Sequence, residues 1–138
     1  MSDDITGLMW SKLFGFACSA TIATSTRTRA GSIARTAIGR AFVADVIEEC
    51  TRIVAAEGFP PPTNVVGILL GMFAAADSTY CPSMLVDMEQ GRPTEGGFTI
   101  GDLVSRAARR GIPAPILGAA LCNLQAYEID RVRGQGAR

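Results

Sequence analysis

The sequence predicts an all-α protein, a single bundle of about six helices that spans residues 1–138 as one domain. Of its 138 residues, 48% are hydrophobic and 19% are charged, which is enough apolar surface for one buried core. Apolar residues recur at the three- and four-residue spacing of a helix through most of the chain. No segment alternates apolar and polar residues between turn signals, as a half-buried strand would.

The first predicted helix runs from Ile5 to about Thr24, with Asp3 or Asp4 as its N-cap. Its apolar positions approximate one helical stripe: Ile5, Leu8, Met9, Leu13, Phe16 and Cys18. Lys12, the single lysine of the chain, falls within this run. We therefore expect Lys12 to lie at or beside a buried face.

The second predicted helix starts after an arginine-rich break at residues 25–31. Ser32 is a favourable N-cap, and the apolar positions that follow keep the 3.6-residue period as far as Gly58. They are Ile33, Ala37, Ile38, Ala41, Phe42, Val46, Ile47, Cys50, Ile53 and Val54. This pattern predicts one continuous helix.

Three consecutive prolines, residues 60–62, end the second helix. Thr63 or Asn64 can cap a third helix that continues to about Ala76. Its residues are apolar almost without a break, which is typical of a helix buried on most sides. We expect it to be the central helix of the bundle.

Prolines and glycines mark the last three helices. Pro82 and Pro93 suit the first turn of a helix, and glycine favours the position just after its end. The predicted helices span residues 82–91, 93–110 and a final segment from about 115 to 134.

The charge balance and residue types exclude several classes of function. Thirteen basic and thirteen acidic residues cancel, so no global field favours nucleic acid or an anionic membrane. The chain has no histidine, and its four cysteines contain no Cys-x-x-Cys pair, so we expect no metal site. Neither a nucleic acid nor a metal is an expected partner.

The compartment predicted from the sequence is the cytoplasm. The four separated cysteines are typical of reduced thiols. The first residues are acidic, where a secretory signal would be basic, and the longest apolar run, residues 65–76, is too short to span a bilayer. We expect no membrane association.

Four motifs in the same order resemble the C-terminal domain of ketopantoate reductases (2-dehydropantoate 2-reductases) over nearly the whole chain. They are Trp10-Ser-Lys-Leu13, Ser83-Met-Leu-Val-Asp87, Gly91-Arg-Pro-Thr-Glu95 and Gly111-Ile-Pro-Ala-Pro115. The resemblance implies a helical substrate domain of the kind also found in 6-phosphogluconate dehydrogenases. It makes Lys12 the catalytic lysine, which protonates or stabilises the carbonyl oxygen of a small-molecule substrate. Glu95 and Ser83 become substrate ligands.

The chain departs from the family pattern at its expected pocket. Phe16 and Ala20 stand where the family has asparagines one and two turns after the lysine, and Tyr80 replaces another asparagine. Gly96 and Gly97 replace an acidic or apolar pair, and a glycine early in a helix costs about 1 kcal/mol relative to alanine. We therefore count all five as substrate-binding positions. The pocket that they line is expected to have fewer amide side chains, and its backbone can come closer to the substrate.

The cofactor domain of the family has no counterpart in the sequence. It contains no Gly-x-Gly-x-x-Gly after a strand, the pattern that holds a dinucleotide. By itself the chain is expected to bind no cofactor, and NADPH only if a partner chain supplies a Rossmann domain.

Each singled-out residue also has a purely structural interpretation. Lys12 can extend its ammonium out of an apolar face, and Glu95 can stabilise the start of a helix. Ser83 suits a first turn, and Phe16 and Tyr80 suit a core. Arg106, Arg109 and Arg110 are predicted to be a solvated face, and Arg92 is predicted to anchor the loop by an ion pair, with Asp87 as a possible partner.

Three functional hypotheses remain open at this stage. The first is the substrate-binding half of a split NADPH-dependent 2-oxo acid reductase, in which Lys12 is the general acid. The second is a cofactor-free binding protein, or an isomerase or cyclase, with a more apolar pocket; there Lys12 polarises a carbonyl and Glu95 acts as base. The third is a structural dimerisation module, which an exposed Lys12 favours.

Overall fold

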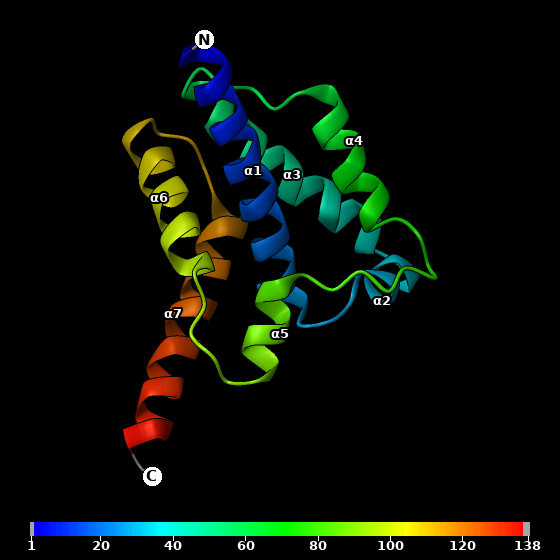
Figure 1. Ribbon diagram of the computed structural model, residues 1–138, viewed down its shortest axis with the longest axis vertical. Coiled ribbons are helices and arrows are strands. Elements are labelled where there is room, and N and C mark those ends of the chain that lie inside the picture. The colour runs from blue at the N-terminus through cyan, green and yellow to red at the C-terminus, as the bar shows by residue number, and fades with distance from the viewer. Residues whose placement is uncertain (1, 137–138) are drawn as a thin grey trace.

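The computed structural model describes residues 2–136, which form seven helices and no strand (Figure 1). Their bounds are α1 Ser2–Thr26, α2 Ala30–Arg35, α3 Gly39–Ala56, α4 Thr63–Met72, α5 Ser83–Glu89, α6 Gly96–Arg109 and α7 Pro115–Gly136. The all-α prediction is confirmed, and the positions proposed as caps for the first helix, Asp3 and Asp4, lie inside α1.

The central helix of the bundle is α1. It contacts α3, α4, α5, α6 and α7, and in Figure 1 it runs between the α6–α7 pair on one side and α3 and α4 on the other. Phe14, Ala17 and Ile22 of α1 are fully buried. The prediction that residues 63–76 form the central helix is therefore wrong.

The helix predicted to be central, α4, lies at the edge of the bundle. Leu69 is its only buried residue, whereas Ile68 is 60% exposed and Leu70 40% exposed. It ends at Met72, short of the predicted Ala76, because Phe73 turns into the core. The apolar composition of α4 therefore does not bury the helix on most sides, because Ile68 and Leu70 face solvent.

Only the C-terminal part of the apolar stripe predicted for α1 is buried, where Cys18 lies in the core and Leu13 and Phe16 pack against it. Ile5, Leu8 and Met9 are 62%, 58% and 66% exposed. The core side is formed by Phe14, Ala17, Cys18, Thr21, Ile22, Ala23 and Thr24. Since α1 is apolar around most of its circumference, periodicity alone did not distinguish the two sides.

The second predicted helix is divided into α2 and α3. Thr36 has an extended backbone (ψ 156°), and both its N–H and its hydroxyl donate to the carbonyl of Ile33, the hydroxyl at 2.8 Å. Gly39 begins α3 against that same carbonyl, where any Cβ would collide with it. The chain therefore turns sharply at residues 36–38, and seven helices result instead of six.

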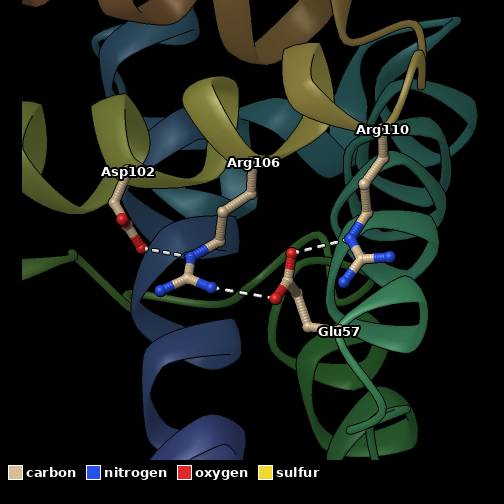
Figure 2. A network of polar contacts seen from close by, with 4 residues as sticks. All are labelled: Glu57, Asp102, Arg106 and Arg110. Atoms are coloured by element: carbon tan, nitrogen blue, oxygen red, sulfur yellow. Dashed lines mark hydrogen bonds and ion pairs between the residues drawn. The ribbon is translucent and has the colours of Figure 1, made fainter.

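An ion-pair network joins α6 to the C-terminal end of α3 (Figure 2). The carboxylate of Glu57 accepts from Arg106 Nη1 and from Arg110 Nε, both at 2.9 Å, and Arg106 Nε also donates to Asp102 at 2.8 Å. The prediction of a solvated arginine face is thus wrong for Arg106, whose side chain is 28% exposed, while Arg109 and the ion-paired Arg110 are exposed as predicted.

The same network reaches α1 through aromatic rings. The guanidinium of Arg106 lies 5.1 Å from the centre of the Trp10 ring, and Trp10 stacks on Phe59 at 5.2 Å. A cation over an indole face adds attraction to the salt bridges. Trp10 lies two residues from Lys12, so these contacts fix the part of α1 that carries the lysine.

The four cysteines form no disulfide. Cys18 of α1 and Cys50 of α3 are buried side by side, and burial, with the hydrogen bond to Cys50, raises the pKa of the Cys18 thiol. Burial therefore favours the protonated, unreactive form of the Cys18 thiol.

By length and composition, residues 4–26 of α1 are apolar enough to cross a membrane, although a core helix passes the same test. The packing of α1 against five other helices accounts for its apolar sequence.

Candidate functional site

One face of α1 carries the candidate site. Lys12, Phe16 and Ala20 are spaced four residues apart and therefore follow each other along one side of the helix, about 6 Å per step. At Ala20, which is 2% exposed, this side enters the core. Toward the N-terminus the same stripe continues into the exposed Leu8 and Met9.

A hollow of about 300 Å³ lies beside the C-terminal half of this stripe. Residues from α1, α4 and the start of α5 line it, and they are Gly15, Phe16, Ser19, Ala20, Leu69, Met72, Tyr80, Pro82, Ser83 and Met84. Four of the predicted substrate-binding residues (Phe16, Ala20, Tyr80 and Ser83) thus meet at one hollow, which we call the larger hollow.

A second, smaller hollow of about 140 Å³ shares Phe16, Ser83 and Met84 with the larger one. Its other lining residues are Asp87, Pro93 and Glu95. Asp87 accepts from Arg92, at 3.1 Å from Nε and 3.0 Å from Nη2, which confirms the predicted anchoring pair. Glu95 is exposed, so its carboxylate is the accessible charge of the smaller hollow.

Tyr80 is held in place by its own backbone and by one ring contact. Its carbonyl accepts the N–H of Ala30 at 3.1 Å, and its N–H donates to the hydroxyl of Ser78 at 3.2 Å. The ring meets Phe73 edge to face at 5.5 Å. The loop reaches α2 because Gly31 has no Cβ to strike the carbonyls of residues 76 and 78.

The turn that carries Glu95 is attached to α7. The hydroxyl of Tyr127 donates to the carbonyl of Arg92 at 2.7 Å, and the N–H of Thr94 donates to Glu128 at 3.0 Å. Burial opposes ionisation of Glu128, but the Thr94 N–H and Arg131 outweigh it and lower its pKa. Glu95 itself precedes the first residue of α6 and makes no capping hydrogen bond.

The two glycines after Glu95 lie apart from the larger hollow. A Cβ on Gly96 would overlap the sulfur of Met84, so this glycine makes room for a side chain that lines both hollows. Gly97 lies in a different depression, of about 470 Å³ between α6 and α7. In this arrangement Gly96 acts through Met84, and Gly97 lines neither the larger nor the smaller hollow.

Lys12 lines neither hollow. Its side chain is exposed and makes no ion pair with a carboxylate of the described residues, Glu95 included. Lys12 lies one helical turn before Phe16, on the N-terminal side of the hollows. The exposed apolar side chains of Ile5, Leu8 and Met9 lie on its other side. The structure thus leaves the ammonium at the open end of the site.

Six lining residues of the larger hollow were not predicted. Gly15 and Ser19 lie three and seven residues after Lys12, so their place on the same helix face was a usable signal. Pro82 and Met84 adjoin the predicted Ser83. Leu69 and Met72 had no sequence signal, since only the packing of α4 brings them to α1.

The described residues contain no group of three metal-ligating side chains. They also contain no strand and no glycine-rich strand-to-helix turn, which are the features that bind a dinucleotide. The residues present therefore do not fit NADPH. What the site offers is an apolar hollow with three hydroxyl groups, one accessible carboxylate and one ammonium.

Comparison with known proteins shows which family shares this sequence and fold. Residues 4–128 match the family described as ketopantoate reductase PanE/ApbA C terminal. An uncharacterised oxidoreductase of Bacillus subtilis (strain 168), YkpB, is 31% identical over 123 residues, which are 89% of this chain and 41% of that protein. The chain therefore spans less than half the length of this relative.

Solved structures share the fold. A dimeric ketopantoate reductase from Staphylococcus aureus matches with a TM-score of 0.78 at 20% identity, over 92% of this chain and 44% of that one. A PanE/ApbA family ketopantoate reductase from Ralstonia eutropha JMP134 matches with 0.76 at 25% identity, over 91% and 42%.

A D-mandelate dehydrogenase has the same TM-score of 0.76, at 18% identity, and is covered over 54% of its length. The family match covers both motif segments that form the site, from Lys12 to Glu95. By its sequence and its fold, the chain belongs to the family of ketopantoate reductase C-terminal domains.

Proposed function

We propose that this chain is the substrate-binding half of an oxidoreductase that reduces a 2-oxo acid with NADPH. The observation that carries the proposal is the face of α1, where Lys12 stands between a hollow of about 300 Å³ and an exposed apolar surface. In such a site the hollow takes the substrate, and the apolar surface takes a second domain.

A cofactor domain outside these residues would supply the hydride. The chain spans 41% of YkpB and 44% of the Staphylococcus aureus enzyme, so more than half of each relative has no counterpart here. Ile5, Leu8 and Met9 form an exposed apolar face beside Lys12. Exposed apolar faces of this kind mark contact surfaces. A Rossmann domain, on this or a partner chain, is our proposed occupant.

Lys12 has the role of general acid in this proposal. An ammonium enclosed between two domains stabilises the negative charge that develops on a carbonyl oxygen, because the surrounding dielectric falls when water leaves. Glu95 and Ser83 bind the polar groups of the substrate from the smaller hollow. The exposure of Lys12 in the isolated helical domain fits a site that is completed only by docking.

The experiment uses the full chain as bait in a lysate of the source cells, followed by an NADPH-oxidation assay of the recovered complex with ketopantoate and related 2-oxo acids. A co-purifying Rossmann subunit and turnover support the split reductase. Recovery of inert bait alone, or of a dimer of the bait only, contradicts it.

In the same assay, Lys12→Ala should lower turnover by about 10²–10⁴-fold, the usual contribution of a positioned general acid. Its helicity and Tm should remain unchanged, because Lys12 is exposed and unpaired among the described residues. Arg109→Ala, which removes an exposed cation of α6, is the matched control and should retain activity. Full activity of the Lys12 variant would remove the lysine from the mechanism.

One observation favours a second candidate, a cofactor-free binding protein or isomerase. The larger hollow contains no amide side chain and no charge, so it suits a more apolar molecule than a reductase of hydroxylated substrates requires. Binding of apolar carbonyl compounds by the bait alone, with no Rossmann partner in any preparation, would favour this candidate. For either function we propose a cytoplasmic location, where thiols stay reduced, for this chain with four free cysteines.

A further inference from the structure

We infer that Tyr127 and Glu128 of α7 are positioning residues for Glu95, and that they act by holding the turn of residues 90–95 against α7. We call this segment the Glu95 turn. For the role of Glu95 as a substrate ligand, the inference rests on the proposed function. The holding of the turn rests on hydrogen bonds within the chain, and it can be tested without any substrate.

The Glu95 turn has few contacts of its own that fix it. It joins α5 to α6 between Gly91, whose φ is 71°, and the buried Gly96. Among the described residues, the backbone of residues 93–95 donates one hydrogen bond, from Thr94. The side chain of Glu95 makes no capping hydrogen bond to α6. The direction of its carboxylate therefore depends on what holds the turn from outside.

Two consecutive residues of α7 hold the Glu95 turn at two points. The hydroxyl of Tyr127 donates to the carbonyl of Arg92 at 2.7 Å. Glu128 accepts both the N–H and the hydroxyl of Thr94, at 3.0 and 3.4 Å. In Figure 1 the segment between α5 and α6 passes beside α7, as these contacts require. Because the second point lies one residue before Glu95, it fixes the peptide next to this side chain.

The two side chains that hold the turn are themselves fixed. Arg131 Nε donates to Glu128 at 2.9 Å. The guanidinium of Arg27, at the end of α1, lies 5.8 Å from the centre of the Tyr127 ring and donates to Asn123 of α7 at 2.6 Å. A functional side chain is placed precisely when its supports are locked by packing and hydrogen bonds. These contacts give the Glu95 turn such a support.

The position of Glu95 should affect substrate affinity more than the chemical step. Glu95 and Lys12 belong to different elements and form no ion pair with each other in the described part of the chain. A residue that binds the ground state and the transition state equally changes KM and leaves kcat unchanged. Loosening the turn should therefore raise the KM for ketopantoate only, whereas loss of Lys12 lowers kcat.

The first measurement uses the reconstituted complex of the NADPH assay. Tyr127→Phe removes only the hydroxyl, and Glu128→Ala removes the acceptor. Each should raise the KM for ketopantoate about three- to tenfold, with the KM for NADPH unchanged. Glu128→Gln keeps an acceptor for the Thr94 N–H and should restore most of the loss. Asp130→Ala, which removes an exposed acid of α7 that has no ion pair among the described residues, is the matched control and should keep the original KM.

A double-mutant cycle shows whether Tyr127 and Glu128 act through Glu95. In a Glu95→Ala background the turn carries no substrate ligand, so Tyr127→Phe and Glu128→Ala should raise the KM no further. A general loss of stability does not depend on Glu95 and would add to its effect. Equal increases in both backgrounds, or an unchanged KM in the single variants, therefore overturn the inference.

Amide hydrogen exchange of the chain by itself tests the holding of the turn. Glu128→Ala should speed exchange of the Thr94 N–H by about tenfold or more. The amides of Val46 and Ile47 in α3 should keep their rates, which shows that the core is folded. Unchanged exchange at Thr94 overturns the inference whether or not the complex has activity. Faster exchange, with no turnover of the unchanged protein in any complex, supports the positioning by α7 and removes the reductase.

Discussion

Glu49 is a buried residue whose carboxylate caps the start of α7. Its side chain belongs to α3 and is 2% exposed, and its two oxygens accept the N–H groups of Ile116 at 3.2 Å and Leu117 at 2.6 Å. These N–H groups belong to the first turn of α7, where no carbonyl of the helix is available to them. A negative charge also suits the positive end of the helix dipole.

We expect Glu49→Ala to lower the free energy of unfolding by about 2–4 kcal/mol, because two hydrogen bonds to a charge are lost and the N–H groups remain buried. Chemical denaturation measures this loss. Glu49→Gln retains one acceptor and should cost less. Glu48→Ala, at an exposed neighbour whose contact with Arg52 is 3.9 Å long, is the control; equal losses at both positions would contradict the capping role.

At the scale of helices, the contact of α6 with α3 and α1 depends on a few charged groups. Glu57 joins Arg106 and Arg110 of α6 to the end of α3 (Figure 2). Arg106 also lies over the Trp10 ring of α1. Side chains of these residues are partly exposed, between 15% and 47%, so each pair alone contributes little and the network contributes more.

This network predicts a dependence of stability on pH. The hydrogen bond from Arg110 lowers the pKa of Glu57 below its ordinary value of 4.5. Burial acts in the opposite direction and raises this pKa, whereas the charges of Arg110 and Arg106 lower it further. A carboxylate with a lowered pKa in the folded state stabilises the fold above its unfolded pKa, and this contribution is lost as the pH falls through the folded value.

Glu57→Gln should therefore lower the Tm at neutral pH, and the difference from the unchanged protein should shrink as the pH falls through the lowered folded-state pKa of Glu57, because the carboxylate is then protonated. Thermal unfolding at a series of pH values measures it. Glu48→Gln, at an exposed position of the same helix, is the matched control. A Tm difference that stays constant with pH would show that the ion pairs do not contribute.

At the scale of the whole molecule, α1 has two apolar sides. One side packs into the bundle, and the other presents Ile5, Leu8 and Met9 to solvent, at 58–66% exposure. Further large apolar side chains are exposed elsewhere, such as Phe98 at 88%, but only the α1 group adjoins Lys12. This is the surface on which we propose that the cofactor domain docks.

Met9→Glu should weaken association with a Rossmann partner by tenfold or more, on the order of the loss of one buried apolar side chain, with the Tm of the isolated chain unchanged. Titration of the partner subunit measures the affinity. Phe98→Glu, on α6 and away from this face, tests whether the effect is specific. If both variants weaken association equally, or neither does, the docking face on α1 is wrong.

Much of the fold was predictable because its signals are local. Proline, glycine and the 3.6-residue period placed most of the helices, and Arg92 was correctly predicted to anchor the loop. The break at residues 36–38 was missed because Ala37, Ile38 and Ala41 keep the apolar period, while contacts with the carbonyl of Ile33 turn the chain. Glu57 and Glu49 act through contacts between helices far apart in sequence, which no local pattern records.

The sequence by itself determined that the chain is helical, that it belongs with the ketopantoate reductases, and that Lys12, Phe16 and Ala20 share a helix face, because spacing on a helix fixes direction. Only the tertiary structure decided which side of α1 is buried, that α4 lies at the edge, and that Leu69 and Met72 complete the larger hollow while Gly97 does not reach it. A helix that is apolar all round satisfies its own pattern in any orientation, and only packing against the other helices selects one.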